Sequence, residues 1–198
     1  KSDDPNAWVV YTSGVEIKPV ILSEEYASSL VSNQVWSVAA DSDYVWVGTG
    51  YGVSAYDKGR GTWTTYTYED GLPSDEISSI AVDGDYVWFG TGRGATKHYK
   101  KSHEWVTFTT EDGLGSDGVT RIVVDGKDIW FGTFDGGVTR YSQQTGKWTT
   151  FTRKDGLAHN TILSMAVDGN YLWVGTPRGL NRYDKTANTW TTYRRDDD

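Results

Sequence analysis

The chain has 198 residues, enough for one sizeable domain, with 14% aromatic residues, 23 glycines and only 4 prolines. Its formal net charge of -8 argues against nucleic acid and anionic membrane surfaces as partners, because phosphate binding needs a concentrated basic surface. The lack of cysteine excludes disulfides and thiolate metal sites, and the sequence has no apolar run of membrane-spanning length, so membrane insertion is not expected.

Residues 3 to about 25 resemble an incomplete copy of a unit that recurs in the rest of the chain. Trp8 aligns with Trp46, but this first copy lacks an opening strand. At the other end, residues 193–198 align with residues 66–71, so the chain stops where the next opening strand would begin. The first copy therefore lacks an opening strand, and an opening strand is the element that would come next after residue 198.

Two series of tryptophans recur through the remaining chain at a nearly constant period. The first series steps by 42, 42 and 43 residues: Trp46, Trp88, Trp130 and Trp173. The second steps by 42, 43 and 42 residues: Trp63, Trp105, Trp148 and Trp190. Such a period is typical of arrays whose units bury their faces against neighbours. We expect the first series to pack between units and the second to cover an outer rim with part of each ring exposed.

Each copy contains four strand-like runs separated by turn residues. In the second copy these runs are Ile77–Val82, Tyr86–Thr91, Ala95–Tyr99 and Glu104–Thr109. Asp83-Gly84 between the first two is a turn that joins antiparallel strands, and no helical period of 3.6 residues is visible. These features favour a β-propeller over a β-solenoid, whose strands pair in parallel.

The predicted fold is thus an all-β propeller of four-stranded antiparallel blades, four complete and one incomplete at the N-terminus. The whole chain forms one domain, with the degenerate blade at 3–30 and the complete copies at 31–73, 74–115, 116–158 and 159–198. Two arrangements remain open, a five-bladed ring closed by both termini or a section of a larger propeller. An open section would expose a sheet edge that invites self-association.

The repeated residues resemble the two-component regulator propeller repeats. The resemblance is carried by Gly71-Leu72-Pro73-Ser74-Asp75, by Trp88-Phe89-Gly90-Thr91 with Gly94, and by Trp173-Val174-Gly175-Thr176 with Gly179-Leu180 and Tyr183-Asp184. It covers residues 31–198 in four copies and residues 3–30 weakly. In that family such repeats form bacterial extracytoplasmic sensor propellers, often joined to a membrane-spanning signalling protein. The resemblance therefore implies a periplasmic or secreted module that binds a ligand or a protein.

The sequence carries no visible catalytic set and implies no cofactor. Aspartate pairs such as Asp41 and Asp43 sit in hairpin turns, where aspartate is a turn former, so calcium cages are not expected there. The histidines His98, His103 and His159 share no metal-ligand spacing, and we expect His98 and His103 at the surface. Paired charges such as Glu111-Asp112 recur at equivalent positions, as structural turn residues would.

A binding site is expected where the copies differ, because the shared residues build the scaffold. The loops after the second strands and the starts of the first strands lie at one end of each sheet. Their variable residues predict a ligand funnel made of Trp36, Tyr51, Arg93, Arg121, Phe134, Asp135, His159 and Arg178. Arginine forms paired hydrogen bonds to carboxylates, and tryptophan stacks on flat rings, so both side chains suit ligand recognition.

The function that follows is a non-catalytic propeller that binds an unidentified small ligand, glycan or protein at this loop face. Two alternatives stay open, a carbohydrate-binding, lectin-like propeller or an architectural subunit of a larger assembly. A lectin-type propeller should repeat its site in every copy, whereas Tyr51, Arg93, Phe134 and Arg178 differ.

Overall fold

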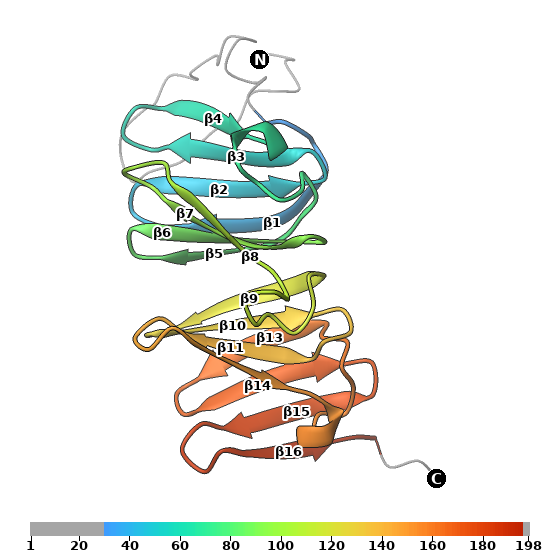
Figure 1. Ribbon diagram of the computed structural model, residues 1–198. Coiled ribbons are helices and arrows are strands. Elements are labelled where there is room, and N and C mark those ends of the chain that lie inside the picture. Colours follow the sequence, from blue (N-terminus) through green and yellow to red (C-terminus); the bar gives the residue numbers. More distant parts are fainter. Residues whose placement is uncertain (1–29, 196–198) are drawn as a thin grey trace, which may run out of the picture.

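The computed structural model describes residues 30–195, which form four four-stranded antiparallel sheets in chain order (Figure 1). The first sheet contains β1 (Val35–Ala40), β2 (Tyr44–Thr49), β3 (Gly52–Asp57) and β4 (Thr62–Tyr66). The second contains β5 (Ile77–Asp83), β6 (Tyr86–Thr91), β7 (Gly94–Tyr99) and β8 (Trp105–Phe108). The third contains β9 (Val119–Asp125), β10 (Asp128–Thr133), β11 (Val138–Ser142) and β12 (Lys147–Phe151). The fourth contains β13 (Ser164–Asp168), β14 (Tyr171–Thr176), β15 (Gly179–Asp184) and β16 (Thr189–Tyr193).

The predicted meander is confirmed, because every strand pairs with its sequence neighbour and all pairs are antiparallel. The hairpin glycines Gly84, Gly126 and Gly169 have φ of 57°, 62° and 53°, the left-handed backbone that such turns require. Two short 3₁₀ helices, η1 (Tyr68–Asp70) and η2 (Arg153–Asp155), lie in the linkers between sheets and were not predicted. In the part of the chain that the structure describes, no helix has the length and apolar character needed to cross a membrane.

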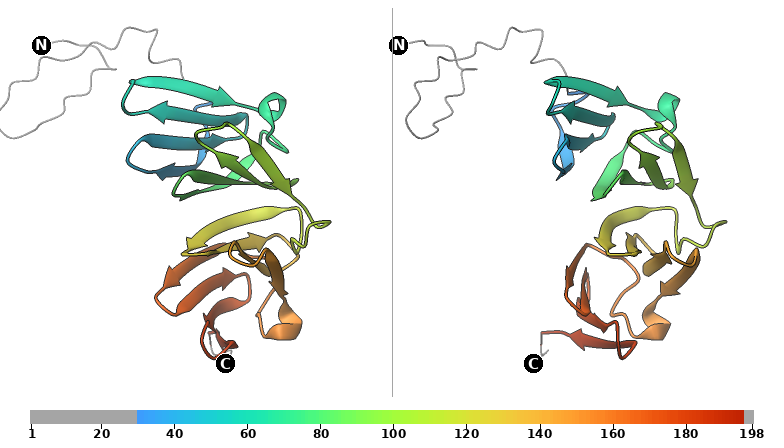
Figure 2. Two further views of the ribbon diagram at one scale, coloured as in Figure 1. Left: turned by 60° about the vertical axis from the view of Figure 1, so that its left-hand side comes forward. Right: turned by 90° about the vertical axis from the view of Figure 1, so that its left-hand side faces the viewer.

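The sheets follow one another along a curved path, each facing the next (Figure 2). Their first strands β1, β5, β9 and β13 contact one another in that order and form the inner edge of the arc. This is the radial arrangement of propeller blades, and it excludes the parallel β-solenoid. The four complete blades are confirmed, whereas the predicted incomplete blade at 3–30 lies almost wholly outside the described residues.

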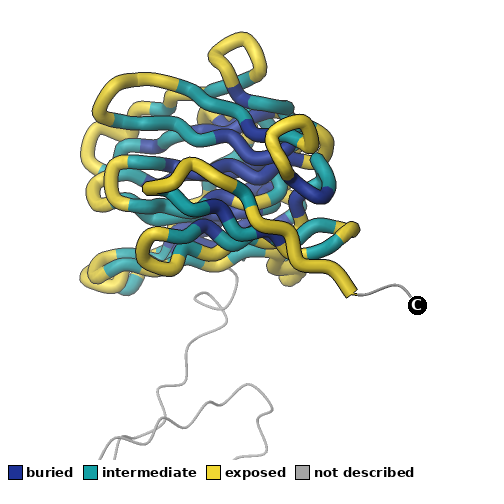
Figure 3. Tube along the Cα trace, turned by 90° about the horizontal axis from the view of Figure 1, so that it is seen from below, coloured by how far each residue is buried: buried dark blue, intermediate teal, exposed yellow. Residues whose placement is uncertain are grey.

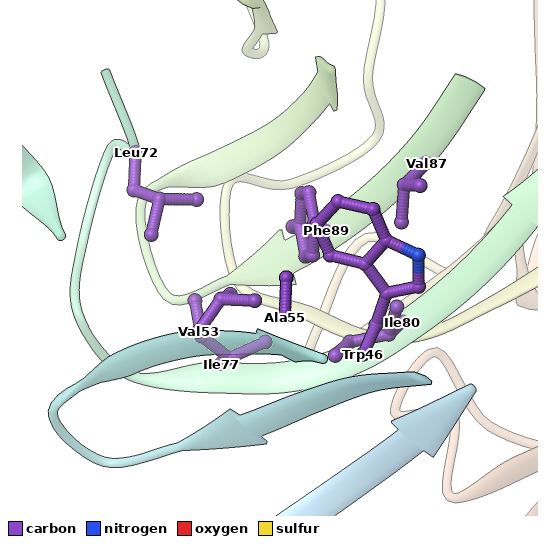
Figure 4. Packing of buried hydrophobic residues seen from close by; sticks show 8 residues of the cluster. All are labelled: Trp46, Val53, Ala55, Leu72, Ile77, Ile80, Val87 and Phe89. Carbon is purple, nitrogen blue, oxygen red and sulfur yellow. The ribbon is translucent and has the colours of Figure 1, made fainter. Parts of the chain in front are cut away.

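Three apolar clusters fill the three interfaces between sheets. Trp46, Trp88 and Trp130 of the first tryptophan series are at most 1% exposed, each within one of these clusters. Figure 4 shows the first cluster, where Trp46 meets Val87 and Phe89 of the next sheet. The second tryptophan series is half-buried in the outer strands, as predicted. We call the flank of each sheet that carries the first-series tryptophan the front flank, and the opposite one the back flank.

Parts of the two end flanks are exposed at positions that are covered in the interior flanks. Val38 on the back flank of the first sheet is 59% exposed, whereas its equivalents Ile80 and Ile122 are 7% and 6% exposed. On the front flank of the last sheet, Leu180 is 42% exposed and Trp173 is only half-buried. Figure 3 looks toward this last sheet and shows buried residues in the interior and exposed ones along β16. The described residues therefore form an arc with two unsatisfied ends.

His98 is fully buried, contrary to the prediction that it lies at the surface. It occupies a back-flank position of β7 and faces the first sheet, where its ring lies 4.0 Å from Trp105 and 6.0 Å from Trp46 between centroids. Neither ring nitrogen has a hydrogen-bond partner among the described residues. Burial, with nearby His103, lowers the pKa of His98 to about 4, so the ring is neutral in the folded protein.

Polar bridges cross the interfaces at the end of the sheets that carries the hairpin turns, which we call the turn end. Lys100 Nζ donates to Asp41 at 2.8 Å, Gln143 Nε2 to Asp83 at 2.8 Å, and Lys185 Nζ to Asp125 at 2.7 Å. Burial alone would raise the pKa of Asp41, but hydrogen bonds from Lys100 and the N–H groups of Tyr44 and Asp43 hold it below its ordinary value. These aspartates thus link each sheet to the next.

Candidate functional site

The opposite end of the sheets, the loop end, carries the linkers between sheets and the loops between second and third strands. Each linker is fixed by its own side chains. The Asp155 carboxylate accepts hydrogen bonds from the backbone N–H and hydroxyl of Thr152, and Asn160 Oδ1 accepts from the N–H of Arg153. The carbonyl of Asn160 in turn accepts from the N–H of Gly137 in the neighbouring loop. The loops therefore rest on a rigid frame, which confirms the structural role expected of the paired charges.

All eight residues predicted for the funnel lie at this loop end. Tyr51, Phe134 and Trp36 are 66%, 65% and 47% exposed. Four more are exposed: Arg93, Arg121, Asp135 and Arg178. His159 is half-buried, and its Nδ1 accepts a hydrogen bond from the N–H of Thr161. Whether they act as one funnel stays a prediction, because they belong to four different blades.

Trp36 and Arg121 replace small polar residues that join the inner strands elsewhere. At the positions equivalent to Trp36, the Ser78 hydroxyl donates to the carbonyl of Val119 in β9 at 2.6 Å, and the Thr120 hydroxyl donates to that of Ile162 just before β13 at 2.7 Å. Trp36 makes no such bond, and its ring lies against Gly50, where an added Cβ would come within 3.1 Å of it. Arg121 Nη1 donates to the carbonyl of Thr120. Both side chains are therefore left available at the surface.

A cleft of ≈ 650 Å³ at the loop end of the last sheet brings four arginines together. It is lined by Arg153, Ala158, Pro177, Arg178, Gly179, Arg194 and Arg195. Of the eight predicted residues, only Arg178 lines it. Among residues 30–195, no carboxylate lines this cleft, and none of the four arginines forms a salt bridge. We call this group the arginine cleft.

Asn181 holds the walls of the arginine cleft in place. It is fully buried in β15, its Oδ1 accepts from the N–H of Ala158 at 3.1 Å, and its Nδ2 donates to the Thr192 hydroxyl at 2.6 Å. The linker that carries Arg153 is thereby tied to β16, which leads into Arg194 and Arg195.

The third sheet uses the same kind of tie with a different residue. The Thr139 hydroxyl accepts from the N–H of Gly115 at 3.0 Å and lies 3.0 Å from the hydroxyl of Thr150. The tie between linker and outer strand is therefore part of the repeated frame. What distinguishes the last blade is the set of arginines that this frame holds together.

Sequence reasoning missed Arg153, Arg194 and Arg195. The signal was available, because the linker that reads Tyr68-Glu69-Asp70 after the first sheet reads Arg153-Lys154-Asp155 after the third. A comparison of the linkers between copies would have shown that basic residues gather toward the C-terminal copies.

Two clefts at the turn end differ from the arginine cleft in their charge. One lies between the first two sheets, and its lysines Lys58, Lys100 and Lys101 face acidic residues such as Asp57 and Asp85. The other has Lys127 beside acidic and amide groups. In these two clefts lysines face acidic groups, whereas the charged residues that line the arginine cleft in the described range are all arginines.

Comparison with known proteins bears on these features. The family model described as "Two component regulator propeller" matches residues 71–93. The predicted resemblance is thereby confirmed on the linker and the first two strands of the second blade. No curated protein sequence matches the chain.

Solved structures share the fold at low sequence identity. The extracellular domain of BT3049 from B. thetaiotaomicron, described as a hybrid two component system, matches with a TM-score of 0.73 and 20% identity over 83% of this chain and 25% of that one. The extracellular domain of BT4673 from the same organism gives a TM-score of 0.68 and 21% identity over 80% of this chain and 22% of that one. The computationally designed protein Ika4 gives 0.60 and 17% identity over 82% of this chain and 92% of that one. The chain thus spans about a quarter of the natural domains that it matches.

Proposed function

We propose that this chain is a non-catalytic, extracytoplasmic, sensor-type propeller module that binds an anionic ligand in the arginine cleft. The observation that carries the proposal is the convergence of four arginines in a cleft that no carboxylate of residues 30–195 lines, on a protein whose net charge is -8. Four guanidinium groups held close together repel one another, and a bound anion would relieve that repulsion. The likeness to extracellular domains of two component systems supports the sensor role.

The ligand class follows from the chemistry of the guanidinium groups. Planar arginine forks recognise carboxylate, sulfate and phosphate groups through paired N–H donors, and their geometry favours ligands with several such groups. The frame built by Asn181 and the two ends of the η2 linker fixes the backbone around the cleft in advance, so little backbone entropy is lost on binding. We therefore expect a small ligand that carries carboxylate or sulfate groups, such as an acidic oligosaccharide or an acidic peptide.

The lectin-like alternative gains no support from the loops. Repeated sugar sites would need the same side chains at the same register in each blade, but the equivalent tips are Tyr51, Arg93, Phe134 and Arg178. The cleft exists at one blade because only there do the neighbouring linker and the end of β16 also supply arginines.

Isothermal titration calorimetry of the purified chain with defined compounds tests the proposal. A uronic acid tetrasaccharide, a sulfated disaccharide and an acidic peptide serve as anionic probes, and a neutral tetrasaccharide serves as the control. At least one anionic probe should bind, and Arg153→Ala/Arg178→Ala should weaken it by about a hundredfold or more, since each charged hydrogen bond contributes about 1.5–3 kcal/mol.

Arg93→Ala is the matched control, because Arg93 occupies the position of Arg178 in the second blade but lies outside the cleft. Its affinity should stay within about twofold of the parent, since it has no arginine partners. Arg121→Ala tests the wider funnel in the same way. An equal loss in all three variants would move the site from the cleft to the whole loop face, and binding of the neutral sugar alone would refute the anionic ligand.

A further inference from the structure

The three interior interfaces share one packing pattern between a front flank and a back flank. Each of the two end flanks carries the residues of one side of this pattern. In every interface, the first-series tryptophan of one sheet's front flank packs on aliphatic residues of the next sheet's back flank. The last sheet presents the front half of this pattern, with half-buried Trp173 and exposed Leu180. The first sheet presents the back half, with exposed Val38. The two end flanks are therefore complementary in apolar shape to each other.

A serine on the inner strand adds a specific hydrogen bond at two interfaces. Ser37 Oγ accepts from the N–H of Ile80 at 2.9 Å, and Ser79 Oγ accepts from the N–H of Ile122 at 3.0 Å. The equivalent serine of the last sheet is Ser164, which is exposed. The equivalent donor on the first sheet is the N–H of Val38. Each end flank thus holds one partner of this bond.

The polar bridge at the turn end also has one partner on each end flank. Inside the arc, the residue after the third strand donates to the first turn aspartate of the preceding sheet, as in the pairs Lys100–Asp41 and Lys185–Asp125. The position of Lys185 is filled in the first sheet by Lys58, which is exposed and donates to the carbonyl of Asp41 in its own sheet at 2.6 Å. The position of Asp125 is filled in the last sheet by Asp168, which is exposed and makes no salt bridge among the described residues.

We propose that a second copy of this chain docks head to tail on these flanks, with the front flank of one copy's last sheet against the back flank of the other's first sheet. Trp173 and Leu180 of one copy then cover Val38 of the other. Ser164 accepts from the N–H of Val38, and Asp168 accepts from Lys58. The occupant is a second copy because the chain itself carries both halves of all three interactions, in the register that its interior interfaces use.

The interface is heterologous, since the two flanks differ, and it closes into a ring only if the same contact forms at both ends of each copy. This arrangement goes beyond the proposed ligand binding and does not depend on it, because the arginine cleft lies at the loop end and the Lys58–Asp168 contact at the turn end.

Sedimentation equilibrium of the whole chain and of two charge-reversal variants tests the proposal. The parent chain should have the mass of two or more copies. Lys58→Glu places glutamate against Asp168, and Asp168→Lys places lysine against Lys58, so each variant alone should associate about tenfold or more weakly. Both positions are exposed, so the circular dichroism spectra and the unfolding temperatures of the diluted variants should match those of the parent.

The decisive measurement is the mixture of the two variants. When copies of the two variants alternate, the introduced lysine of one faces the introduced glutamate of the other, and the native Asp168 faces the native Lys58 at the next junction. Every junction then pairs opposite charges, so assembly should return to the level of the parent chain.

Recovery in the mixture supports head-to-tail docking of copies. A parent chain that is monomeric at all concentrations would overturn the proposal and point to residues 1–29 as the cover of an end flank. An oligomer insensitive to both charge reversals would overturn it as well.

Discussion

The interior interfaces and the end flanks are built from the same repeated residues, yet they differ in burial. Trp88 and Trp173 are equivalent in sequence, but Trp88 is fully buried and Trp173 is half-buried. The difference in burial comes from the neighbouring sheet and not from the residue type. Trp88 has the third sheet against it, whereas nothing in the described residues lies against the front flank of the last sheet. In a repeat array, stability therefore belongs to the interfaces as much as to the sheets.

The largest expected effect comes from removing equivalent tryptophans from the two environments. Trp88→Ala should lower the free energy of unfolding by about 3–5 kcal/mol, because it empties a close-packed interface. Trp173→Ala should cost about 1–2 kcal/mol, since its ring is already partly hydrated. Urea denaturation followed by circular dichroism gives both values, and equal losses would contradict the contrast between interior and end.

A second contrast separates the interfaces themselves. The back-flank position of the third strand holds Tyr141 and Tyr183 in the third and fourth sheets but His98 in the second. Tyr183 donates its hydroxyl proton to Asn188, whereas the nitrogens of His98 have no partner among the described residues. Among the three interfaces of the described range, only this one therefore contains a buried group that would become charged in mild acid.

We expect the first interface to weaken as the pH falls from 6.5 to 4. The pKa of His98 is about 4 when folded against an ordinary value of 6.5, so the unfolded chain binds the proton first and stability falls on acidification. The loss should approach about 3 kcal/mol near pH 4. Asp41, whose pKa lies below its ordinary 3.8, titrates below this window.

His98→Tyr is the matched control, since it installs the residue used at the equivalent positions of the other sheets. Urea denaturation at several pH values should give this variant a flatter pH dependence between pH 6.5 and 4. His103 faces His98 with 5.8 Å between the ring centroids, so His103→Gln should reduce the effect only slightly. An unchanged pH dependence in His98→Tyr would assign the acid sensitivity elsewhere.

The smallest expected effect lies at the turn end of the interfaces. Lys185→Ala removes a bridge to Asp125 between side chains that are 18% and 19% exposed, and it should cost about 1 kcal/mol. Lys101→Ala removes a bridge to Asp85 between side chains that are 70% and 52% exposed, and its cost should be close to zero. Thermal unfolding at low and high salt measures both, and a larger loss in Lys101→Ala would reverse the comparison.

Much of the fold was predictable because the tryptophan period marks each blade, and because the Asp-Gly turns and the strand pattern depend on residues close together in the sequence. The strand boundaries around Trp88 follow from alternation and turns, and the structure reproduces them within a residue or two. The burial of His98 was missed because the residue was considered alone. Its alignment with Tyr56, Tyr141 and Tyr183 would have placed it on a packed flank.

The arginine cleft was only partly predictable. Arg178 stood out as a variable loop tip, but its partners lie in a linker and after the last strand. Pairing of β15 with β16 and the hydrogen bonds of Asn181 bring those segments together, and the prediction missed them because it compared the loop tips between copies but not the linkers.

Amide hydrogen exchange measured by mass spectrometry tests most directly the claim that neighbouring sheets stabilise one another. The Lys58→Glu variant is the suitable sample, because docking of a second copy would cover the end flanks. The central strands β6 and β10 of the interior sheets should exchange most slowly, and β2 and β14 of the end sheets should exchange faster. Protection of β14 equal to that of β10 would contradict the account.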